Sequence, residues 1–360
     1  AKRITKSIAQ KSAENCISKI EVADDGMGMN RADLETAFYR HATSKIRRIT
    51  DLNSVLSLGF RGEALPSIAS VSKVTVKSRS IDEMSGYIGN VVDGRMKITG
   101  EAGMPVGTKI TVDDLFYNTP ARKKFLKSAV VEQGHITKLI SNFILSSPQI
   151  AFVLQVDSRT VLHSSGSGSM QQAVVSVYGA ETLSNLVPVA YADANIKIYG
   201  LVSRPPFSRS NRKYYHFYVN GRLVKSRELS YMLELAYETL LPERRYPVGI
   251  IYLQVDPKTI DVNVHPAKTE IRFRQLNTVK EAMSVAVKAA LAPKVAVPKL
   301  NSGSLSAVKP TEENTAAQAE NNIKKTIGDL EIQSESGKTF KLSDLFSFGS
   351  KDKEEPKTEP

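Results

Sequence analysis

The sequence predicts an α+β protein with two domains and a disordered tail. Short alternating stretches typical of strands are interspersed with stretches whose apolar residues recur at helical spacing. The chain has 360 residues, enough for two ordinary domains. From about residue 293, Lys, Glu, Ser, Thr, Asn and Pro dominate, and such a segment cannot bury enough area to offset the entropy of ordering. We therefore expect domains over 1–180 and 181–292, followed by a disordered linker over 293–360.

The composition narrows the functional classes. Apolar residues make up 41% of the chain, so a substantial core is possible. No apolar run is long enough to span a bilayer and no signal peptide is visible, so no membrane association is expected. The single cysteine, Cys16, excludes a disulfide framework and indicates a reducing, cytoplasmic compartment. The net charge of +12 favours a polyanionic partner such as nucleic acid.

The first predicted domain mixes strands and helices. Residues 1–15 show no clear period. Strands are predicted over 17–23, 73–79, 87–92, 107–112 and 150–156. Helices are predicted over 31–39, with Asn30 as a cap, and over 131–145 and 170–178. Residues 116–126 read as a loop entering a short helix at Pro120, and residues 164–169 as a Ser/Gly loop.

The second predicted domain is similar in character. Strands are expected over 186–191, 196–203, 214–219, 249–255, 260–268 and 271–273. Helices are expected over 229–241 and 277–291. A basic loop covers 204–213, and Asn220-Gly221 is a turn.

The stretch Leu58–Ser67 is a candidate phosphate site. Gly59 and Gly62 flank Phe60 and Arg61, and an apolar helix-like run over 64–69 follows. A glycine turn that opens a helix leaves N–H groups unpaired, and the helix dipole adds positive charge there. The alternative is a loop that enters a buried helix.

A second candidate begins where the strand over 17–23 ends. Asp24, Gly26 and Gly28 form a tight acidic turn that lets a carboxylate point into a pocket. A carboxylate only accepts hydrogen bonds, so it suits an amino group such as that of adenine. The alternative is an Asp-Gly hairpin turn.

The segment 40–48 is small, polar and basic. Thr43, Ser44 and Lys45 are candidate phosphate contacts, and a solvated basic loop is the alternative. His41 is expected to be structural, since no second His or Cys lies near it in sequence.

Six motifs occur in a fixed order: Asp24-x-Gly26-x-Gly28, Arg40-His-Ala-Thr-Ser-Lys45, Gly59-Phe-Arg-Gly-Glu-Ala-Leu65, Gly107-Thr108, Phe116-Tyr-Asn-Thr-Pro-Ala-Arg122 and Asp261-Val-Asn-Val-His-Pro-Ala-Lys268. Together they resemble the amino-terminal half of the MutL family of DNA mismatch repair proteins. That family is a branch of the GHKL ATPases, with gyrase, the large heat-shock chaperone and the sensor histidine kinases. The resemblance covers about residues 17–291.

The resemblance implies a GHKL-type ATPase α/β sandwich followed by a smaller ribosomal-protein-like transducer domain, with ATP and Mg²⁺ as cofactors. Asp24 would bind the adenine amino group, Gly26 and Gly28 would shape the pocket, and Thr108 would support the adenine end. Lys268 would contact the γ-phosphate. The ATP lid and phosphate loop would contribute Thr43, Ser44, Lys45, Gly59, Phe60, Arg61, Gly62, Glu63, Ala64 and Leu65.

The resemblance also implies a partner set. The family binds DNA in a basic groove when ATP closes a homodimer, and it links a MutS-type mismatch recognition protein to downstream helicase or nuclease factors. We expect a cytoplasmic bacterial protein associated with the nucleoid. DNA phosphates would be met by Arg204, Arg209, Arg212, Lys213 and Arg222. Each of these is also compatible with a solvated charge.

One family motif is not found. The family carries a general-base Glu, and four residues later an Asn that helps to hold Mg²⁺. Residues 1–23 contain no such pair, since Glu14 and Asn15 are adjacent. No catalytic base and no metal ligand are therefore identified, and we expect a partial sequence truncated at both ends. The alternatives are a fragment that binds nucleotide and DNA without hydrolysing ATP, and a DNA-binding scaffold, which the phosphate-loop motifs disfavour.

Overall fold

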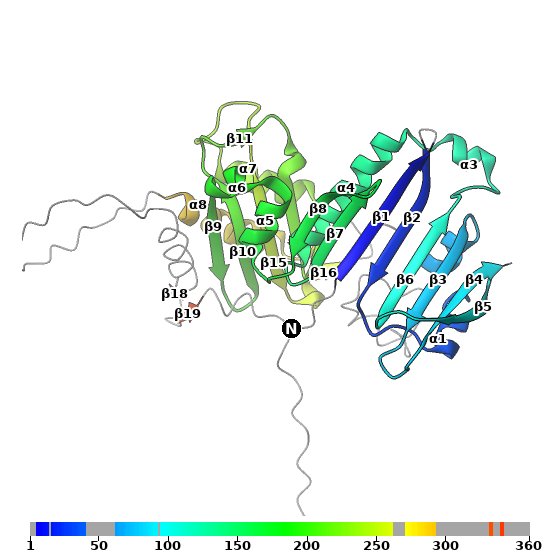
Figure 1. The fold of residues 1–360 in the computed structure, drawn as a ribbon. Helices are drawn as coiled ribbons and strands as arrows, with labels where there is room; N and C mark the ends of the chain where they lie inside the picture. Colours follow the sequence, from blue (N-terminus) through cyan, green and yellow to red (C-terminus); the bar gives the residue numbers. More distant parts are fainter. Residues whose placement is uncertain are drawn as a thin grey trace, which may run out of the picture. The chain divides into compact units, whose positions relative to one another are not determined.

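The structure, a computed structural model, describes residues 5–13, 16–40, 62–92, 94–261, 271–292, 331–333 and 339–341 (Figure 1). The chain divides into two compact units, Ala1–Ser184 and Asn185–Pro360. Both units mix helices with sheets, which confirms the predicted α+β class. Among the described helices, none is both long and apolar enough to cross a membrane.

The first unit is built on an eight-stranded sheet with the order β5-β4-β3-β6-β2-β1-β7-β8 (Figure 1). Neighbouring strands are antiparallel except β1 and β7, which are parallel. The strands are β1 (Thr5–Ala13), β2 (Cys16–Asp24), β3 (Lys73–Arg79), β4 (Gly86–Val92), β5 (Arg95–Ala102), β6 (Gly107–Asp113), β7 (Ala151–Val156) and β8 (Arg159–Ser165).

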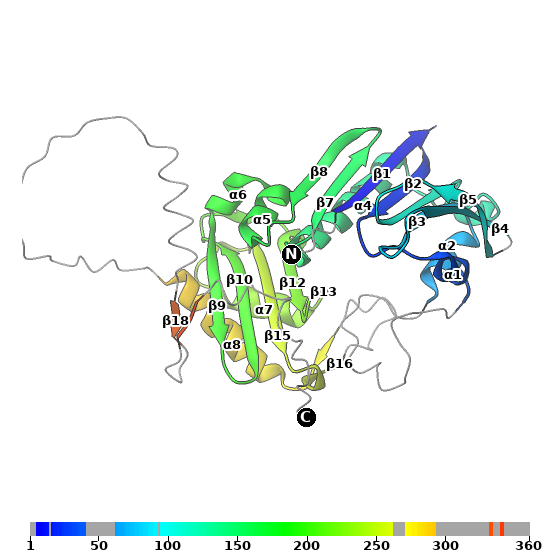
Figure 2. The ribbon, with the colours of Figure 1, turned by 60° about the horizontal axis from the view of Figure 1, so that its bottom comes forward.

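Two short helices, α1 (Arg31–Thr36) and α2 (Ala64–Ala69), pack on the β3–β6 part of this sheet (Figure 2). Leu34 of α1 is fully buried in a cluster with Val74 and Val76 of β3, and Leu65 of α2 packs against the same cluster. The side chain of Asn30 accepts the backbone N–H of Asp33 at 2.8 Å, which confirms the predicted cap. The remaining helices of the unit are α3 (Pro120–Lys124), α4 (Ala129–Ser146), α5 (Met170–Tyr178) and α6 (Ala180–Ser184).

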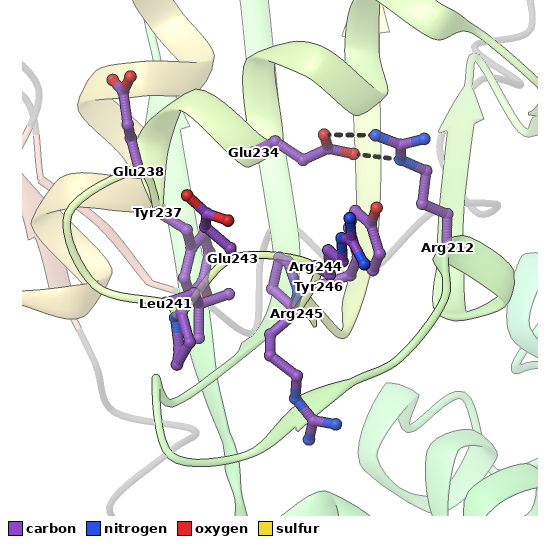
Figure 3. Close-up of a pocket in the computed structure, with 11 residues that line it drawn as sticks. Arg212, Glu234, Tyr237, Glu238, Leu241, Glu243, Arg244, Arg245 and Tyr246 are labelled. Atoms are coloured by element: carbon purple, nitrogen blue, oxygen red, sulfur yellow. Dashed lines mark hydrogen bonds and ion pairs between the residues drawn. The ribbon is translucent and has the colours of Figure 1, made fainter.

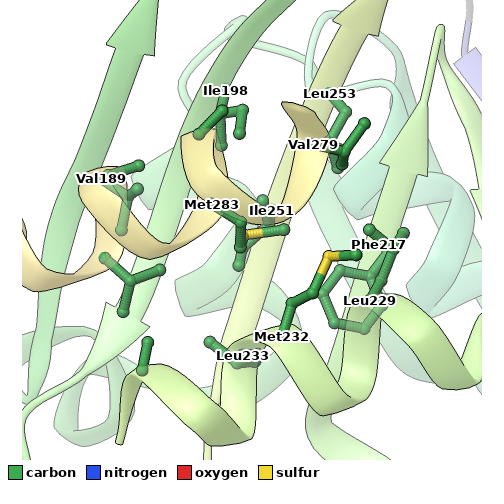
Figure 4. Packing of buried hydrophobic residues seen from close by; sticks show 14 of the residues in the cluster. Val189, Ile198, Phe217, Leu229, Met232, Leu233, Ile251, Leu253, Val279 and Met283 are labelled. Carbon is green, nitrogen blue, oxygen red and sulfur yellow. The ribbon is translucent and has the colours of Figure 1, made fainter. Parts of the chain in front are cut away.

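The second unit has a five-stranded sheet with the order β13-β12-β15-β10-β9. Its strands are β9 (Leu186–Ala192), β10 (Ile196–Ser203), β12 (Tyr215–Val219), β13 (Arg222–Val224) and β15 (Gly249–Val255). Helices α7 (Arg227–Ala236) and α8 (Leu276–Leu291) pack on this sheet and enclose a core that includes Phe217, Ile251 and Leu233 (Figure 4). Burying each such side chain contributes about 1.5–3 kcal/mol.

Short elements complete this unit. The basic loop contains β11 (Ser208–Arg209) and a 3₁₀ turn, η2 (Arg212–Tyr214), and β11 pairs with β14 (Tyr246–Pro247). Another 3₁₀ turn, η3 (Pro257–Thr259), precedes β16 (Ile260–Asp261), which pairs with β17 (Arg272–Phe273). Within 293–360, where the sequence predicts disorder, the described residues are two paired strands, β18 (Glu331–Gln333) and β19 (Thr339–Lys341); the rest lies outside the described residues.

The elements predicted from sequence are confirmed with small shifts at their ends. Helix α7 ends at Ala236 instead of residue 241, because the chain changes to i→i+3 hydrogen bonds, from Tyr237 N–H to Glu234 O and from Leu240 N–H to Tyr237 O. The Ser/Gly loop expected from residue 164 begins later, since β8 extends to Ser165. The strand expected over 260–268 is described only as β16. The prediction missed the strands β1, β5, β8, β11, β13 and β14 and the helix α6, and β18 and β19 lie where it expected disorder.

Candidate functional site

Three polar side chains form a row at one end of the first sheet. Asp24 closes β2 and lies opposite Thr108 of β6, and Thr108 lies opposite Ser78 of β3. Directly opposed residues of antiparallel strands point to the same face of a sheet. The row therefore crosses three strands that are separate in sequence. Val76 and Ile110, two positions along the same strands, belong to the core that α1 and α2 cover.

Ser78 connects this row to the turn after Asp24. Its hydroxyl accepts the Met29 N–H at 2.8 Å, donates to the Gly107 carbonyl at 3.1 Å, and is bonded to the Thr108 hydroxyl at 2.9 Å. Ser78 is fully buried and Thr108 is 9% exposed. The sequence interpretation missed Ser78, although it continues the inward-facing alternation of Val74 and Val76 in β3 as a polar residue.

Gly28 in this turn and Gly107 at the start of β6 are fixed by close backbone approach. A Cβ on Gly28, whose φ is +68°, would lie 1.8 Å from the Arg79 carbonyl oxygen. A Cβ on Gly107 would lie 2.1 Å from the Asp24 carbonyl oxygen. The chain continues from this turn into α1 and does not pair back along β2. The alternative of an Asp-Gly hairpin is therefore wrong.

Gly26 orients the Asp24 carboxylate. Its N–H donates to Asp24 Oδ1 at 3.0 Å, and a Cβ at Gly26 would lie 2.7 Å from that oxygen. One carboxylate oxygen is thus held by the backbone, and among the described residues the other remains open to a ligand. The half-buried Asp24 and the Thr108 hydroxyl together present oxygen atoms at the end of the sheet.

The predicted phosphate loop is described only at its end. Gly62 has a φ of +62°, and Glu63 precedes the first residue of α2, Ala64, without a side-chain cap. Leu65 packs its side chain into the core, so only its backbone is available at this point. Six predicted ATP contacts in 41–61, and one beyond 261, lie outside the described residues: Thr43, Ser44, Lys45, Gly59, Phe60, Arg61 and Lys268.

The five basic candidates for DNA contact have different surroundings. The guanidinium of Arg209 lies 4.2 Å from the ring centre of Phe207 and 5.1 Å from that of Tyr214. Arg212 forms a bidentate ion pair with Glu234, with Nε–Oε1 at 2.6 Å and Nη2–Oε2 at 2.9 Å. The hydrogen bonds to Glu234 raise the pKa of Arg212. Of the other three candidates, Arg204 and Lys213 are exposed and Arg222 is half-buried.

A cavity of about 310 Å³ lies beside Arg212 (Figure 3). Three arginines and three glutamates are among its lining residues, and one of each forms the Arg212–Glu234 ion pair. Arg245 donates to the Ser208 hydroxyl at 3.0 Å and to its carbonyl at 2.7 Å. Burial raises the pKa of Tyr237, whose hydroxyl donates to the Ser203 carbonyl. The lining residues are Arg212, Glu234, Tyr237, Glu238, Leu241, Pro242, Glu243, Arg244, Arg245, Tyr246 and Pro247.

The fold agrees with the comparison to known proteins. Residues 174–292 match the family described as DNA mismatch repair protein, C-terminal domain. The chain is 40% identical over 320 residues to the DNA mismatch repair protein MutL of Desulforamulus reducens, covering 88% of this chain and 49% of the relative. The chain belongs to the MutL family of DNA mismatch repair proteins. MutL of Desulforudis audaxviator is 43% identical over 282 residues, covering 78% of this chain and 50% of the relative. The chain thus spans about half the length of these MutL relatives.

Solved structures place the fold among the GHKL ATPase domains. The Aquifex aeolicus MutL ATPase domain complexed with ADP has a TM-score of 0.52 at 26% identity, covering 77% of this chain and 88% of that chain. The N-terminal domain of a DNA repair protein has a TM-score of 0.65 at 22% identity, with 80% and 88% covered. The B-subunit of DNA gyrase from Myxococcus xanthus, at 11% identity and a TM-score of 0.50, shares the fold.

Metal ligands are a separate question. Within the part of the chain that the structure describes, no three His, Cys, Asp or Glu side chains gather closely enough to hold a metal ion. The oxygens of the Asp24 row come from one carboxylate and two hydroxyls, a set suited to hydrogen bonding.

Proposed function

We propose that this MutL chain binds ATP, with the adenine at the Asp24 row. The observation that carries the proposal is the register that aligns Asp24, Thr108 and Ser78 on one face of the sheet. A carboxylate with one oxygen held by Gly26 and the other open is suited to accept the adenine amino group. The Aquifex aeolicus MutL domain, solved with ADP, supports a nucleotide as the ligand.

The phosphates would lie toward the start of α2, where Gly62, Glu63, Ala64 and Leu65 offer backbone N–H groups. The family resemblance adds further ATP contacts to this proposal: the lid residues Thr43 to Lys45, the loop residues Gly59 to Arg61, and Lys268. Lys268 suits the γ-phosphate as a point charge whose contact depends on the nucleotide state. Mg²⁺ would neutralise the phosphates when it is bound.

For the whole protein we propose an ATP-gated dimeric clamp on DNA. It would couple a MutS-type mismatch recognition protein to helicase or nuclease factors in a bacterial cytoplasm, close to the nucleoid. For this chain alone, the competing proposal is nucleotide and DNA binding without hydrolysis, because 1–23 carry no Glu with an Asn four residues later. A general base is worth about 10²–10⁴ in rate, so a turnover assay separates the two.

The nucleotide proposal is tested by titrating the purified chain with a non-hydrolysable ATP analogue and Mg²⁺ while following thermal unfolding. Ligand at 100 times its dissociation constant adds roughly 2.7 kcal/mol to the stability of a protein that binds it only when folded. We expect a clear rise in Tm for the wild type, and a much smaller rise for Asp24→Asn because the amide turns a donor or a weaker acceptor to the adenine amino group. Asp82→Asn, in an exposed loop, is the matched control.

Two results contradict this proposal. One is a wild-type chain whose melting does not respond to the analogue. The other is an equal response from Asp24→Asn and Asp82→Asn, which would place the nucleotide elsewhere.

DNA contact is proposed for Arg204, Arg209, Arg212, Lys213 and Arg222 as phosphate neutralisers. Exposed Arg204 and Lys213 fit this role most directly, whereas Glu234 already neutralises Arg212. Removing one cation that neutralises a phosphate should reduce the slope of log K against log salt by about 1. We expect Arg204→Ala and Lys213→Ala each to do so in a fluorescence anisotropy titration with duplex DNA. Unchanged slopes for both variants would remove the loop from the DNA interface.

A further inference from the structure

Ser78 cannot contact a ligand, because it is fully buried. It is nevertheless bonded to three groups that surround the Asp24 row. These are the Met29 N–H at 2.8 Å, the Thr108 hydroxyl at 2.9 Å and the Gly107 carbonyl at 3.1 Å. The inference below rests on the proposed binding of ATP at this row.

The number of protons fixes the direction of these hydrogen bonds. A serine hydroxyl has one proton to donate and two lone pairs that accept. The Met29 amide can only donate and the Gly107 carbonyl can only accept, so Ser78 uses one lone pair for the first and its proton for the second. The remaining lone pair receives the proton of Thr108. Thr108 therefore donates inward and keeps only lone pairs for a ligand.

We propose that Ser78 is a positioning residue that holds Thr108 as a hydrogen-bond acceptor, so that the site selects a purine with a 6-amino group over one with a 6-oxo group. Thr108 and Asp24 lie opposite each other on neighbouring strands, so both acceptors serve the same end of the sheet. An amino group donates directly to such acceptors. An oxo group brings lone pairs to lone pairs, and a buried polar group without a partner is costly.

The selectivity is read from the dissociation constants of non-hydrolysable ATP and ITP analogues, measured by isothermal titration calorimetry on the full 360-residue chain. ITP carries an oxo group in place of the amino group. In Ser78→Ala, Thr108 is free to turn its proton toward the ligand. We expect the preference for ATP over ITP to fall about five- to tenfold, the effect of one neutral hydrogen bond. Ser78→Cys fills the same buried space with a weak acceptor and should show the same change.

Thr108→Val tests the same arrangement without altering Ser78. If Thr108 is an acceptor, this near-isosteric change should weaken ATP binding about five- to tenfold and leave ITP binding unchanged or tighter. In Ser78→Ala/Thr108→Val the ATP-to-ITP preference should equal that of Thr108→Val alone, because Ser78 acts through the Thr108 hydroxyl. Unliganded melting curves of each variant report whether it folds.

Other results overturn the inference. Equal losses of ATP and ITP binding in the Ser78 variants would mean that Ser78 only supports the fold. A loss of ITP binding in Thr108→Val that exceeds the loss of ATP binding would mean that Thr108 donates to the ligand, and equal losses would mean that Thr108 does not distinguish the two purines. Absence of ATP binding by the wild type would instead contradict the proposed nucleotide site itself.

Discussion

The Asp24 row and the basic loop of the second unit both gather polar side chains, but they use their hydrogen-bonding capacity differently. At the Asp24 row, the Gly26 N–H occupies one oxygen of the carboxylate, and the buried hydroxyls of Thr108 and Ser78 are bonded to each other on the neighbouring strands. At the basic loop, Arg212 is paired with Glu234 in a bidentate contact, and Arg245 is bound to Ser208. The first region keeps acceptors for a ligand, whereas in the second region opposite charges largely satisfy one another.

This difference shows why the density of charge is a weaker guide to a site than the direction of hydrogen bonds. In the sequence, the arginines of the basic loop make it a candidate for DNA contact. In the structure, one of these guanidinium groups stabilises α7 through Glu234, and another stacks on Phe207 and Tyr214. The Asp24 row has little charge, but its geometry is specified by close backbone contacts.

The largest expected effect on stability comes from disturbing the close backbone contacts at the Asp24 row. In Gly28→Ala, the new Cβ meets the Arg79 carbonyl at 1.8 Å and the residue keeps a φ of +68°. The backbone strain alone costs about 1–3 kcal/mol, and the clash adds to it. Denaturant unfolding should show a loss of stability together with loss of nucleotide-dependent stabilisation. The substitution would remove the close backbone contacts that distinguish the Asp24 row from the basic loop.

Gly134→Ala in α4 is the matched control. An added Cβ there has no neighbour within 4 Å, and alanine favours the helix by about 0.5–1 kcal/mol. The two substitutions should therefore change stability in opposite directions. A Gly28→Ala variant as stable as Gly134→Ala would contradict the close approach of the turn to β3.

The next effect concerns the Arg212–Glu234 pair. Its side chains are 57% and 25% exposed, so Glu234→Gln should cost about 0.5–1 kcal/mol, and less at high salt. The same variant releases Arg212 and should tighten DNA binding in an anisotropy titration. Glu238→Gln makes the same charge change at the same cavity. If both variants tighten DNA binding equally, the pair does not restrain Arg212.

Much of the fold could be predicted because the central strands carry clear patterns. The bounds of β10 and β15 agree with the sequence prediction, and β15 reads as a continuous apolar run because five of its residues in succession are buried. The missed strands β5 and β8 lie at the two edges of the first sheet. Most of their residues face solvent, so their sequences lack the alternation that identifies a half-buried strand.

The site could be predicted only in part for a related reason. Asp24, Gly26 and Gly28 lie within five residues of one another, and their spacing identifies a turn. Ser78 is 49 residues from Met29 and 30 from Thr108, so its role depends on strand register that no local pattern contains. Likewise Glu234 is 22 residues from Arg212, and the sequence of the basic loop gives no sign of that partner.

The smallest expected effect on stability concerns Asp193. Unlike the carboxylate of Asp24, the Asp193 carboxylate uses both of its oxygens for hydrogen bonds within its own turn. Asp193 Oδ1 accepts the N–H groups of Asn195 at 2.7 Å and Ile196 at 2.8 Å, and Oδ2 accepts the Tyr191 hydroxyl at 3.0 Å. Partial burial by itself raises the pKa of Asp193, but these hydrogen bonds outweigh it, so the pKa lies below its usual value. We expect Asp193 to stabilise the β9–β10 turn and to bind nothing else.

Because the folded-state pKa of Asp193 is depressed, its contribution is present above the unfolded pKa of about 3.9 and is lost as the pH falls through the folded value. Asp193→Asn should therefore reduce stability at pH 7 by about 0.5–1 kcal/mol, and the difference from wild type should shrink below about pH 4. Tyr191→Phe, which removes one of the three donors, should give a smaller difference with the same pH dependence. Denaturant unfolding between pH 3 and pH 7, spanning the range around the unfolded pKa of about 3.9, measures both. A difference that persists unchanged in acid would mean that the Asp193 side chain stabilises the turn by its shape and not by its charge.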